Sequence, residues 1–155
     1  MGARLNRGGS RQDYQTPKKL MIAIYDRFGI PGFTLDAAAS SENAQAERFY
    51  TEEDNGLEQP WYTWTWCNPP FGNIAPWVFK ANCERVKGSY SMILVPASVG
   101  SNWWKDYVHG KAYVTFLNGR ITFVGATDPY PKDCALLMYS PYQDGGYTVW
   151  SWGND

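Results

Sequence analysis

The sequence predicts an α/β fold in which the sheet is mostly parallel, with a late antiparallel hairpin and helices on both faces. In the first half of the chain, short apolar strands alternate with helical patterns, which is typical of parallel strands joined by crossovers. In the second half, strands follow one another with little helix between them. The length of 155 residues suits a single core.

The first helix should begin at Thr16-Pro17, with Thr16 as its N-cap residue and Pro17 in the first helical position. Apolar residues then recur at helical spacing until Gly29, which ends the helix. Residues 33–36 form a short buried strand that ends at Asp36 and runs into Ala37-Ala38-Ala39-Ser40. Such a strand end allows backbone amides to approach a ligand closely, and a tight strand-to-helix turn without a ligand explains the same residues.

The later elements follow from apolar runs and from the residues that end them. Asn118-Gly119 between two apolar segments has the signature of a β-hairpin, with residues 120–124 as its second strand. Residues 147–152 alternate in the manner of an edge strand. The other expected strands are residues 48–50, 63–67, 91–95, 112–117 and 134–139, and the other expected helices are residues 72–86 and 102–108.

Charge is distributed unevenly along the chain although the net charge is only −1. Residues 1–13 are rich in Gly, Ser and Arg and are expected to be a flexible basic arm, followed by a single domain over residues 14–155. Residues 42–58 contain mainly acidic charges. A basic arm and an acidic loop suggest two different partners.

Cysteine and histidine usage argues against a metal site. The three cysteines are far apart and lack paired spacing, and the chain has one histidine. No secretory signal, lipidation motif or long apolar run is visible, so the expectation is a protein without a membrane anchor, located in the cytoplasm.

The segment Asn68-Pro69-Pro70-Phe71 directly follows the strand at residues 63–67. Each proline lacks an N–H and holds the preceding residue extended, so carbonyl groups here stay available to a ligand. The Asn68 amide adds an acceptor oxygen, and Phe71 offers a ring for stacking. Such a corner suits the exocyclic amine of a nucleobase, because two acceptors can take its two hydrogens. A Pro-Pro turn beside a buried Phe explains the same four residues without a ligand.

With these segments in order, the chain resembles the phage-type DNA adenine-N6 methyltransferases over about residues 14–124. The resemblance implies a Rossmann-like methyltransferase fold, S-adenosylmethionine as cofactor, DNA as partner and a phage or prophage gene acting in a bacterial cell. It implies that Asn68, Pro69, Pro70 and Phe71 grip a flipped-out adenine. It also implies a set of cofactor contacts: Thr16, Pro17, Asp36, Ala37 and Ala38, with Asp54 as a further candidate.

Two departures from the family pattern are visible. The glycine-rich signature after the first strand is replaced by Ala37-Ala38-Ala39, and Phe71 stands where many relatives have Tyr. The second change keeps the stacking face and removes a hydroxyl group.

Candidate phosphate contacts and alternative functions complete the predictions. Since no recognition domain fits this length, base specificity is expected in loops such as residues 98–104 or 127–132. The alternatives are an amino methyltransferase for cytosine N4, RNA or protein glutamine, an inactive nucleic-acid-binding module, and a small interaction protein. The candidate phosphate contacts are Arg4, Arg7 and Arg11 in the arm, together with Lys80, Arg85, Lys105 and Arg120.

Overall fold

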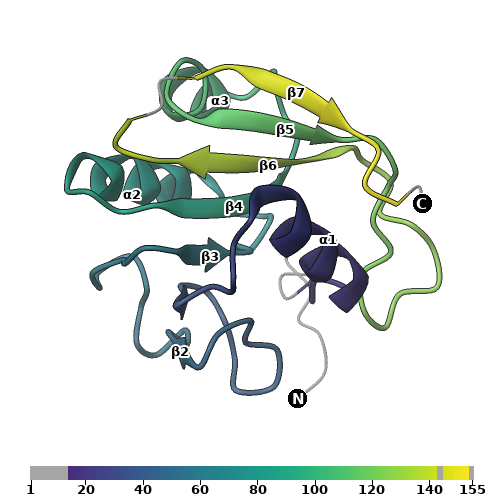
Figure 1. The fold of residues 1–155 in the computed structure, drawn as a ribbon, viewed down its shortest axis with the longest axis horizontal. Helices are drawn as coiled ribbons and strands as arrows, with labels where there is room; N and C mark the ends of the chain where they lie inside the picture. Colours follow the sequence, from purple (N-terminus) through teal and green to yellow (C-terminus); the bar gives the residue numbers. More distant parts are fainter. Residues whose placement is uncertain (1–13, 143–144, 154–155) are drawn as a thin grey trace.

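The computed structural model describes residues 14–142 and 145–153, so Arg4, Arg7 and Arg11 lie outside the described residues. The described residues form three helices and seven strands (Figure 1). In chain order these are α1 (Lys18–Phe28), β1 (Leu35–Asp36), β2 (Arg48–Phe49), β3 (Thr65–Cys67), α2 (Ala75–Val86), β4 (Ser91–Pro96), α3 (Asn102–Tyr107), β5 (Tyr113–Leu117), β6 (Cys134–Tyr139) and β7 (Tyr147–Trp150).

All seven strands belong to one sheet in the order β2-β1-β3-β4-β6-β5-β7. The first four strands in this order are parallel to one another, and β7 is parallel to β5. β6 runs antiparallel to both of its neighbours, β4 and β5. The prediction of a mostly parallel sheet with a late antiparallel part is confirmed.

The position predicted for the hairpin is wrong. The antiparallel partner of β5 is β6, which the chain reaches through residues 118–133, and residues 120–124 form no strand. The apolar residues after Asn118-Gly119 have another role, because Ile121 and Phe123 are buried in the core while they belong to a loop. The Tyr130 N–H donates to the Ile121 carbonyl at 2.7 Å, which folds this loop back on itself.

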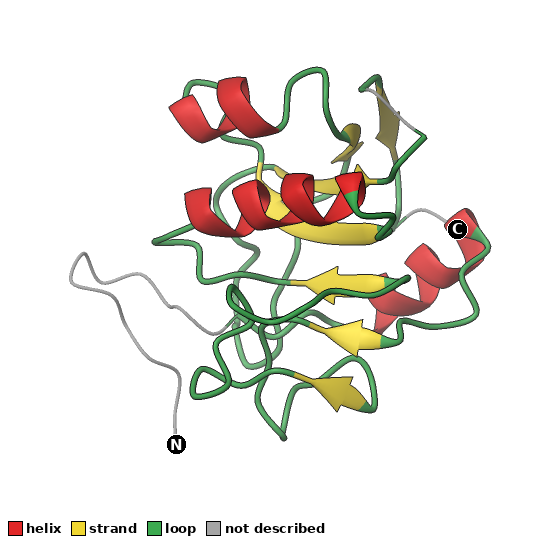
Figure 2. Cartoon of the chain, turned by 90° about the vertical axis from the view of Figure 1, so that its left-hand side faces the viewer, coloured by secondary structure: helices red, strands yellow, loops and turns green. Residues whose placement is uncertain are grey.

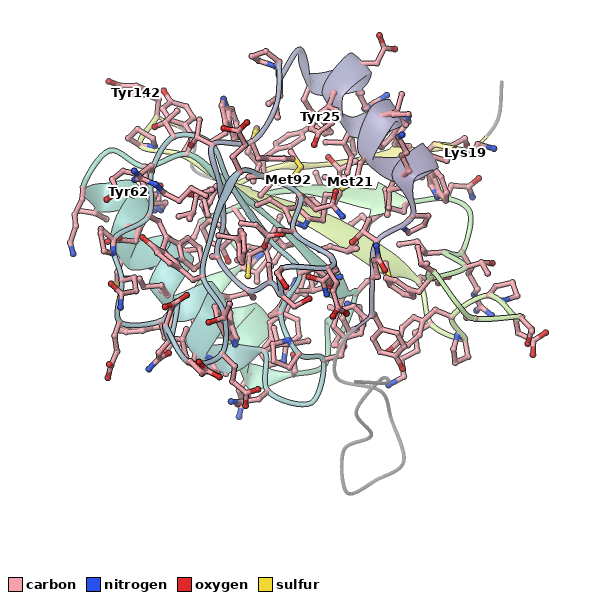
Figure 3. The ribbon with its side chains drawn as sticks, turned by 90° about the horizontal axis from the view of Figure 1, so that it is seen from below. Lys19, Met21, Tyr25, Tyr62, Met92 and Tyr142 are labelled. Carbon is pink, nitrogen blue, oxygen red and sulfur yellow. The ribbon has the colours of Figure 1, made fainter. Side chains whose placement is uncertain are left out.

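Two hydrophobic clusters lie on opposite faces of the sheet. Successive residues of β4 alternate between them: Met92 packs in the cluster with α1, and Ile93 packs in the cluster with α2 and α3. Figure 2 shows the helices on the two sides of the sheet. Met21 of α1 belongs to the same cluster as Met92, and both are labelled in Figure 3. The predicted helices on both faces are thus confirmed.

Parallel strands place their carboxyl ends at one edge of the sheet. In this molecule that edge carries the chain after β1, after β3 and after β4. The connections on either side of β2, residues 37–47 and 50–64, contain no helix. Irregular backbone therefore covers the part of the edge next to β1.

Candidate functional site

A cleft opens at the carboxyl ends of β1 and β3. The chain leaves β1 to form β2 on one side and returns to form β3 on the other side, and open α/β sheets bind ligands where the strand order reverses in this way. The cleft has a volume of about 980 Å³, enough for a nucleoside-sized ligand. Its lining residues come from residues 14–16, 36–45, 51–56 and 66–70, with Trp77 and Val124.

Asp36 is the last residue of β1 and lines the cleft, with only 3% of its surface exposed. Its Oδ1 accepts a hydrogen bond from the Ala38 N–H at 3.2 Å, and its Oδ2 accepts one from the Gln45 N–H at 2.9 Å. Burial raises the pKa of Asp36 to about 6, against the opposing effect of these two hydrogen bonds. The carboxyl group therefore fastens the chain after β1 to the strand end.

The small residues after β1 allow a second segment of backbone to pack directly on the strand. Ala37 is fully buried and its N–H donates to the Trp66 carbonyl at 2.9 Å, so Ala37 extends the sheet and does not line the cleft, whereas Ala38 does. Gly56 lies against Ala37, and a Cβ on Gly56 would stand 2.1 Å from the Ala37 carbonyl oxygen. The sequence placed Gly56 in a loop but gave no sign of this contact.

Asp54 shapes the cleft from outside it. Its Oδ2 accepts hydrogen bonds from the Thr51 N–H at 2.9 Å and from the Thr51 hydroxyl at 3.0 Å. These bonds lower the pKa of Asp54, which is exposed. Glu53 and Asn55 line the cleft and Asp54 does not. Asp54 was a candidate cofactor contact, but the structure places it in the turn that positions Glu53 and Asn55, outside the lining of the cleft.

The cleft is acidic. Glu42, Glu52 and Glu53 line it together with Asp36, and no lysine or arginine is found among the described residues of its lining. A cavity with this excess of acidic side chains favours a ligand that carries positive charge.

Asn68 follows β3 directly and presents an amide to the cleft. Its Nδ2 donates to the Tyr14 carbonyl and, at 3.1 Å, to the Thr16 hydroxyl. Because a carbonyl oxygen only accepts hydrogen bonds, the contact with Tyr14 fixes which end of the amide is the nitrogen. Oδ1 is buried and has no hydrogen-bond partner among the described residues. A buried acceptor without a partner is costly in a folded protein, so this oxygen is suited to an incoming donor.

Pro69 and Pro70 differ in whether their carbonyl groups are already used in a hydrogen bond. The Pro70 carbonyl accepts a hydrogen bond from the Asn73 N–H at 3.1 Å, which turns the chain toward α2. Pro69 is buried and does not line the cleft, whereas Pro70 does, but the Pro69 carbonyl directly follows Asn68 and no hydrogen bond to it is found among the described residues. Its carbonyl is therefore the better candidate for a second acceptor next to Asn68 Oδ1.

Phe71 is half-buried and belongs to an aromatic cluster. Its ring centroid lies 5.2 Å from that of Tyr14, 5.5 Å from that of Tyr130 and 6.0 Å from that of Phe123. Tyr14 lines the cleft and Phe71 does not. The corner thus presents Asn68 to the cleft and an aromatic surface beside it, and Tyr14 is a part of that surface which the sequence did not single out.

The sequence predicted Thr16 as the N-cap residue of the first helix, and this prediction is wrong. Pro17 is the N-cap residue of α1, and no side chain caps that end. The Thr16 hydroxyl instead accepts the hydrogen bond from Asn68, and Thr16 is buried in the cleft wall. The partner lies 52 residues away in the sequence, which is why local pattern suggested a cap. Pro17 itself does not line the cleft.

Trp77 lines the cleft from the first turn of α2, and its ring stacks on Trp61 with centroids 6.5 Å apart. The sequence predicts a helix over residues 72–86, but it did not single out Trp77 as a cleft residue. Its position shortly after the Asn-Pro-Pro-Phe corner is the sequence signal that could have found it.

The four basic candidates outside the arm do not share one surface. The Arg85 guanidinium donates to Asn82 and to the Ser140 carbonyl, at the edge of the sheet opposite to Asn68. Lys80 pairs with the buried Glu84 at 3.5 Å.

The other two candidates are exposed, and one of them follows a strand that ends at the carboxyl edge. Arg120 follows β5 and is half-exposed, with an ion pair to Asp133 at 3.3 Å. Lys105 is exposed on α3, the helix that follows β4. The structure therefore leaves Arg120 as the candidate near the carboxyl edge, whereas Lys105 lies in the last turn of α3, which leads toward the start of β5.

Within the described part of the chain, no cluster of three or more His, Cys, Asp or Glu side chains is arranged to hold a metal ion. None of the helices in that same part has the length and apolar character needed to cross a membrane.

Comparisons with known proteins point to one family. The family described as DNA N-6-adenine-methyltransferase (Dam) matches residues 6–139. A DNA N-6-adenine-methyltransferase of Haemophilus phage HP1 (strain HP1c1) is 30% identical over 117 residues, which cover 70% of this chain and 68% of the relative. A protein of the same description from Escherichia phage T1 is 29% identical over 114 residues, covering 72% of this chain and 47% of the relative. The chain thus spans about half to two thirds of the length of these relatives.

Among solved structures, a predicted O-methyltransferase from Agrobacterium tumefaciens matches with a TM-score of 0.40 and 15% identity, over 88% of this chain and 64% of the other. A likeness this distant carries no argument about fold or function.

Proposed function

The chain belongs to the DNA N-6-adenine-methyltransferase (Dam) family, and we propose that it transfers a methyl group from S-adenosylmethionine to the exocyclic amine of an adenine in DNA. The single observation that carries this proposal for the site is the buried Asn68 Oδ1, which has no partner among the described residues and lines the cleft. The reaction would take place in the cytoplasm of a bacterial host, as expected for relatives of phage origin.

The residues of the cleft fit S-adenosylmethionine in charge and in shape. The cofactor carries a sulfonium and an ammonium group against a single carboxylate, so it is a cation overall, and the lining is acidic and lacks lysine and arginine among its described residues. Ala38 and Gly56 keep side-chain bulk away from the end of β1, and Trp77 supplies an aromatic ring. When bound, the cofactor supplies an electrophilic methyl group. Of the residues predicted to contact the cofactor, Asp36, Ala38 and Thr16 line the cleft that we propose as its site.

The corner after β3 is suited to the target amine. Asn68 Oδ1 and the Pro69 carbonyl would each accept a hydrogen bond from one N–H group of the amine. These two bonds would reduce the delocalisation of the nitrogen lone pair into the ring, which leaves the lone pair available for the methyl group. Positioned acceptors of this kind act through orientation and through charge that develops in the transition state. Asn68 cannot take up a proton, and no strong base is required because the amine proton becomes acidic once the methyl group has moved.

The target amine is shielded in a paired duplex, so the base must leave the stack or be single-stranded. Unstacking costs a few kcal/mol, which stacking on the aromatic surface of Phe71 and Tyr14 would offset. The arm residues Arg4, Arg7 and Arg11, which precede Tyr14 in the chain, are proposed as phosphate contacts together with Arg120 and Lys105. Base specificity would come from residues 98–104 and 127–132, which lie in or next to loops at the carboxyl edge.

Incubation of the purified chain with DNA and cofactor labelled in the methyl group, followed by identification of the modified nucleoside, tests the proposal. N6-methyladenine in DNA is the expected product. N4-methylcytosine, a product from RNA or protein only, or binding of DNA with no transfer would overturn it in favour of the corresponding alternative function.

A further inference from the structure

The hydrogen bonds of Asn68 connect the corner to the segment before α1. Both described partners of Nδ2 come from residues 14–16: the Tyr14 carbonyl and the Thr16 hydroxyl, the latter at 3.1 Å. Thr16 is 3% exposed, and its hydroxyl is the only side-chain partner that the described residues give to this amide. No hydrogen bond from within β3 or α2 holds the amide group in its orientation.

We propose that Thr16 is a positioning residue: with the Tyr14 carbonyl, it fixes the rotation of the Asn68 amide so that Oδ1 faces the target amine. This inference rests on the proposed function for its consequence in turnover. It differs from the prediction that Thr16 contacts the cofactor, because here the Thr16 hydroxyl binds Asn68, the residue that accepts a hydrogen bond from the target base.

The physical reason lies in the two ends of an amide. A rotation of about 180° about the Cβ–Cγ bond exchanges Nδ2 and Oδ1, and a nitrogen in the place of Oδ1 would point two donors at an amine that needs an acceptor. The rotated amide would also set Oδ1 against the Tyr14 carbonyl, with no proton between two acceptors. Thr16 adds a second hydrogen bond to Nδ2, which narrows the range of rotation about the Cβ–Cγ bond. Because a hydroxyl can also donate, the Tyr14 carbonyl selects which end of the amide faces it, and Thr16 holds the amide in that orientation.

The same reasoning predicts that a carboxylate is not tolerated at this position. Asn68→Asp keeps two acceptor oxygens for a target amine, but it removes the donor that Tyr14 and Thr16 share. The carboxylate would face a carbonyl oxygen in a buried place, which is costly. Turnover of Asn68→Asp is expected to fall by more than about tenfold.

Thr16→Val tests the inference with little change in volume. If Thr16 positions Asn68, the variant lowers kcat by roughly 3- to 10-fold, as expected for one neutral hydrogen bond, and leaves the Kd for S-adenosylmethionine unchanged. Thr16→Ser retains the hydroxyl and should restore most of kcat. A weaker cofactor affinity with normal kcat in Thr16→Val would overturn the inference and return Thr16 to the cofactor site.

Thr65→Val is the matched control. Thr65 is a fully buried threonine at the other end of β3, and its hydroxyl bonds to the N–H and carbonyl of Tyr62. This variant should lower the melting temperature and leave kcat of the folded protein unchanged. If Thr65→Val and Thr16→Val reduce kcat equally, the effect of Thr16 is a general loss of packing and the inference fails.

The side-chain amide of Asn68 gives a readout that does not depend on turnover. In NMR spectra of the free protein, its two Nδ2 protons should exchange slowly with water, and should do so in Thr16→Ser but not in Thr16→Val. Unchanged exchange in Thr16→Val would overturn the inference even if the wild-type chain methylates DNA. Conversely, a wild-type chain that methylates nothing would overturn the proposed function while this readout still decides on Thr16.

Discussion

The wall of the cleft that follows β1 and the wall that follows β3 use their polar side chains differently. On the β1 wall, both carboxylate oxygens of Asp36 accept hydrogen bonds from backbone amides, and Asp54 holds Thr51 in a turn. On the β3 wall, Asn68 uses its nitrogen for internal hydrogen bonds and leaves its buried oxygen without a partner among the described residues.

This difference separates two kinds of function within one cleft. Side chains of the β1 wall use their hydrogen bonds to shape the backbone, so their loss should change stability and the affinity for a ligand. Asn68 on the β3 wall keeps an acceptor open, so its loss should change turnover. Variants on the two walls test this division.

The largest effect is expected for Asn68→Ala. Removal of one positioned acceptor typically lowers kcat by roughly 10²- to 10³-fold, and the affinity for S-adenosylmethionine should stay close to that of the wild type because the β1 wall is untouched. Steady-state kinetics on DNA and calorimetric titration with the cofactor measure the two quantities. Asn82→Ala is the control, since Asn82 bonds to Arg85 at the opposite edge of the sheet and should retain full turnover. Normal kcat with lost cofactor binding in Asn68→Ala would contradict the division of roles between the two walls.

Asp36 should impose a pH dependence on stability. Its pKa in the folded protein is about 6, above the ordinary 3.8, because it is buried. The folded state therefore holds the proton more tightly, so the stabilisation by protonated Asp36 is fully present below about pH 4 and is lost as the pH rises through about 6. A shift of this size corresponds to about 3 kcal/mol.

Urea unfolding of the wild type and of Asp36→Asn between about pH 4 and pH 7 measures this effect. The free energy of unfolding of the wild type should fall relative to the variant as the pH rises. Asp54→Asn is the control, because hydrogen bonds from Thr51 hold the pKa of Asp54 below its ordinary value, so this group should stay ionised across the range. A difference between wild type and Asp36→Asn that does not change with pH would show that Asp36 is less buried than the structure has it.

Gly56→Ala should affect the β1 wall alone. The new Cβ would stand 2.1 Å from the Ala37 carbonyl, so the loop after β2 must move away from β1, at a cost of roughly 1–3 kcal/mol in the free energy of unfolding. Cofactor affinity should fall with it, and kcat at saturating cofactor should change little. Gly100→Ala is the matched control, because nothing lies within 4 Å of a Cβ at that position. Equal stability of the two variants would contradict the close packing of Gly56 on β1.

Local sequence pattern was enough to predict the strand ends that define the site. Asp36 precedes tiny residues and Asn68 precedes two prolines, and each combination ends a strand in a way that leaves polar groups at the sheet edge. The mostly parallel sheet followed in the same way from the order of apolar runs. These features depend on residues that are neighbours in the chain.

Contacts between distant segments could not be predicted in this way. The bond from Asn68 to Thr16 and the contact of Gly56 with Ala37 depend on how two loops meet over the sheet edge. In residues 120–124 the sequence predicted a strand that the structure does not contain. A loop that covers the core can alternate between buried and exposed residues as a strand does. Periodicity reports burial, and only the pairing of backbone groups distinguishes the two cases.

Deletion of residues 1–12 is expected to have the smallest effect on kcat and on cofactor affinity, the two quantities that depend on the walls of the cleft. The deletion removes Arg4, Arg7 and Arg11, and neither Asn68 nor Asp36 depends on these residues for a described hydrogen bond. kcat at saturating DNA and the Kd for the cofactor should therefore stay unchanged. The acidic cleft cannot attract a DNA backbone, so positive charge from outside the walls must supply that affinity.

DNA binding itself should weaken on this deletion, and the dependence of log K on log salt should become shallower by roughly 0.9 for each phosphate that the arm no longer neutralises. Titration of DNA at several salt concentrations, with the wild type, the truncated chain and Arg85→Ala side by side, measures the slope. Arg85 is the control because it bonds to Asn82 and Ser140 away from the cleft, and its variant should keep the wild-type slope. An unchanged slope in the truncated chain would make the arm a tail that does not bind DNA and would shift the backbone contacts to Arg120 and Lys105, the two exposed basic candidates among the described residues.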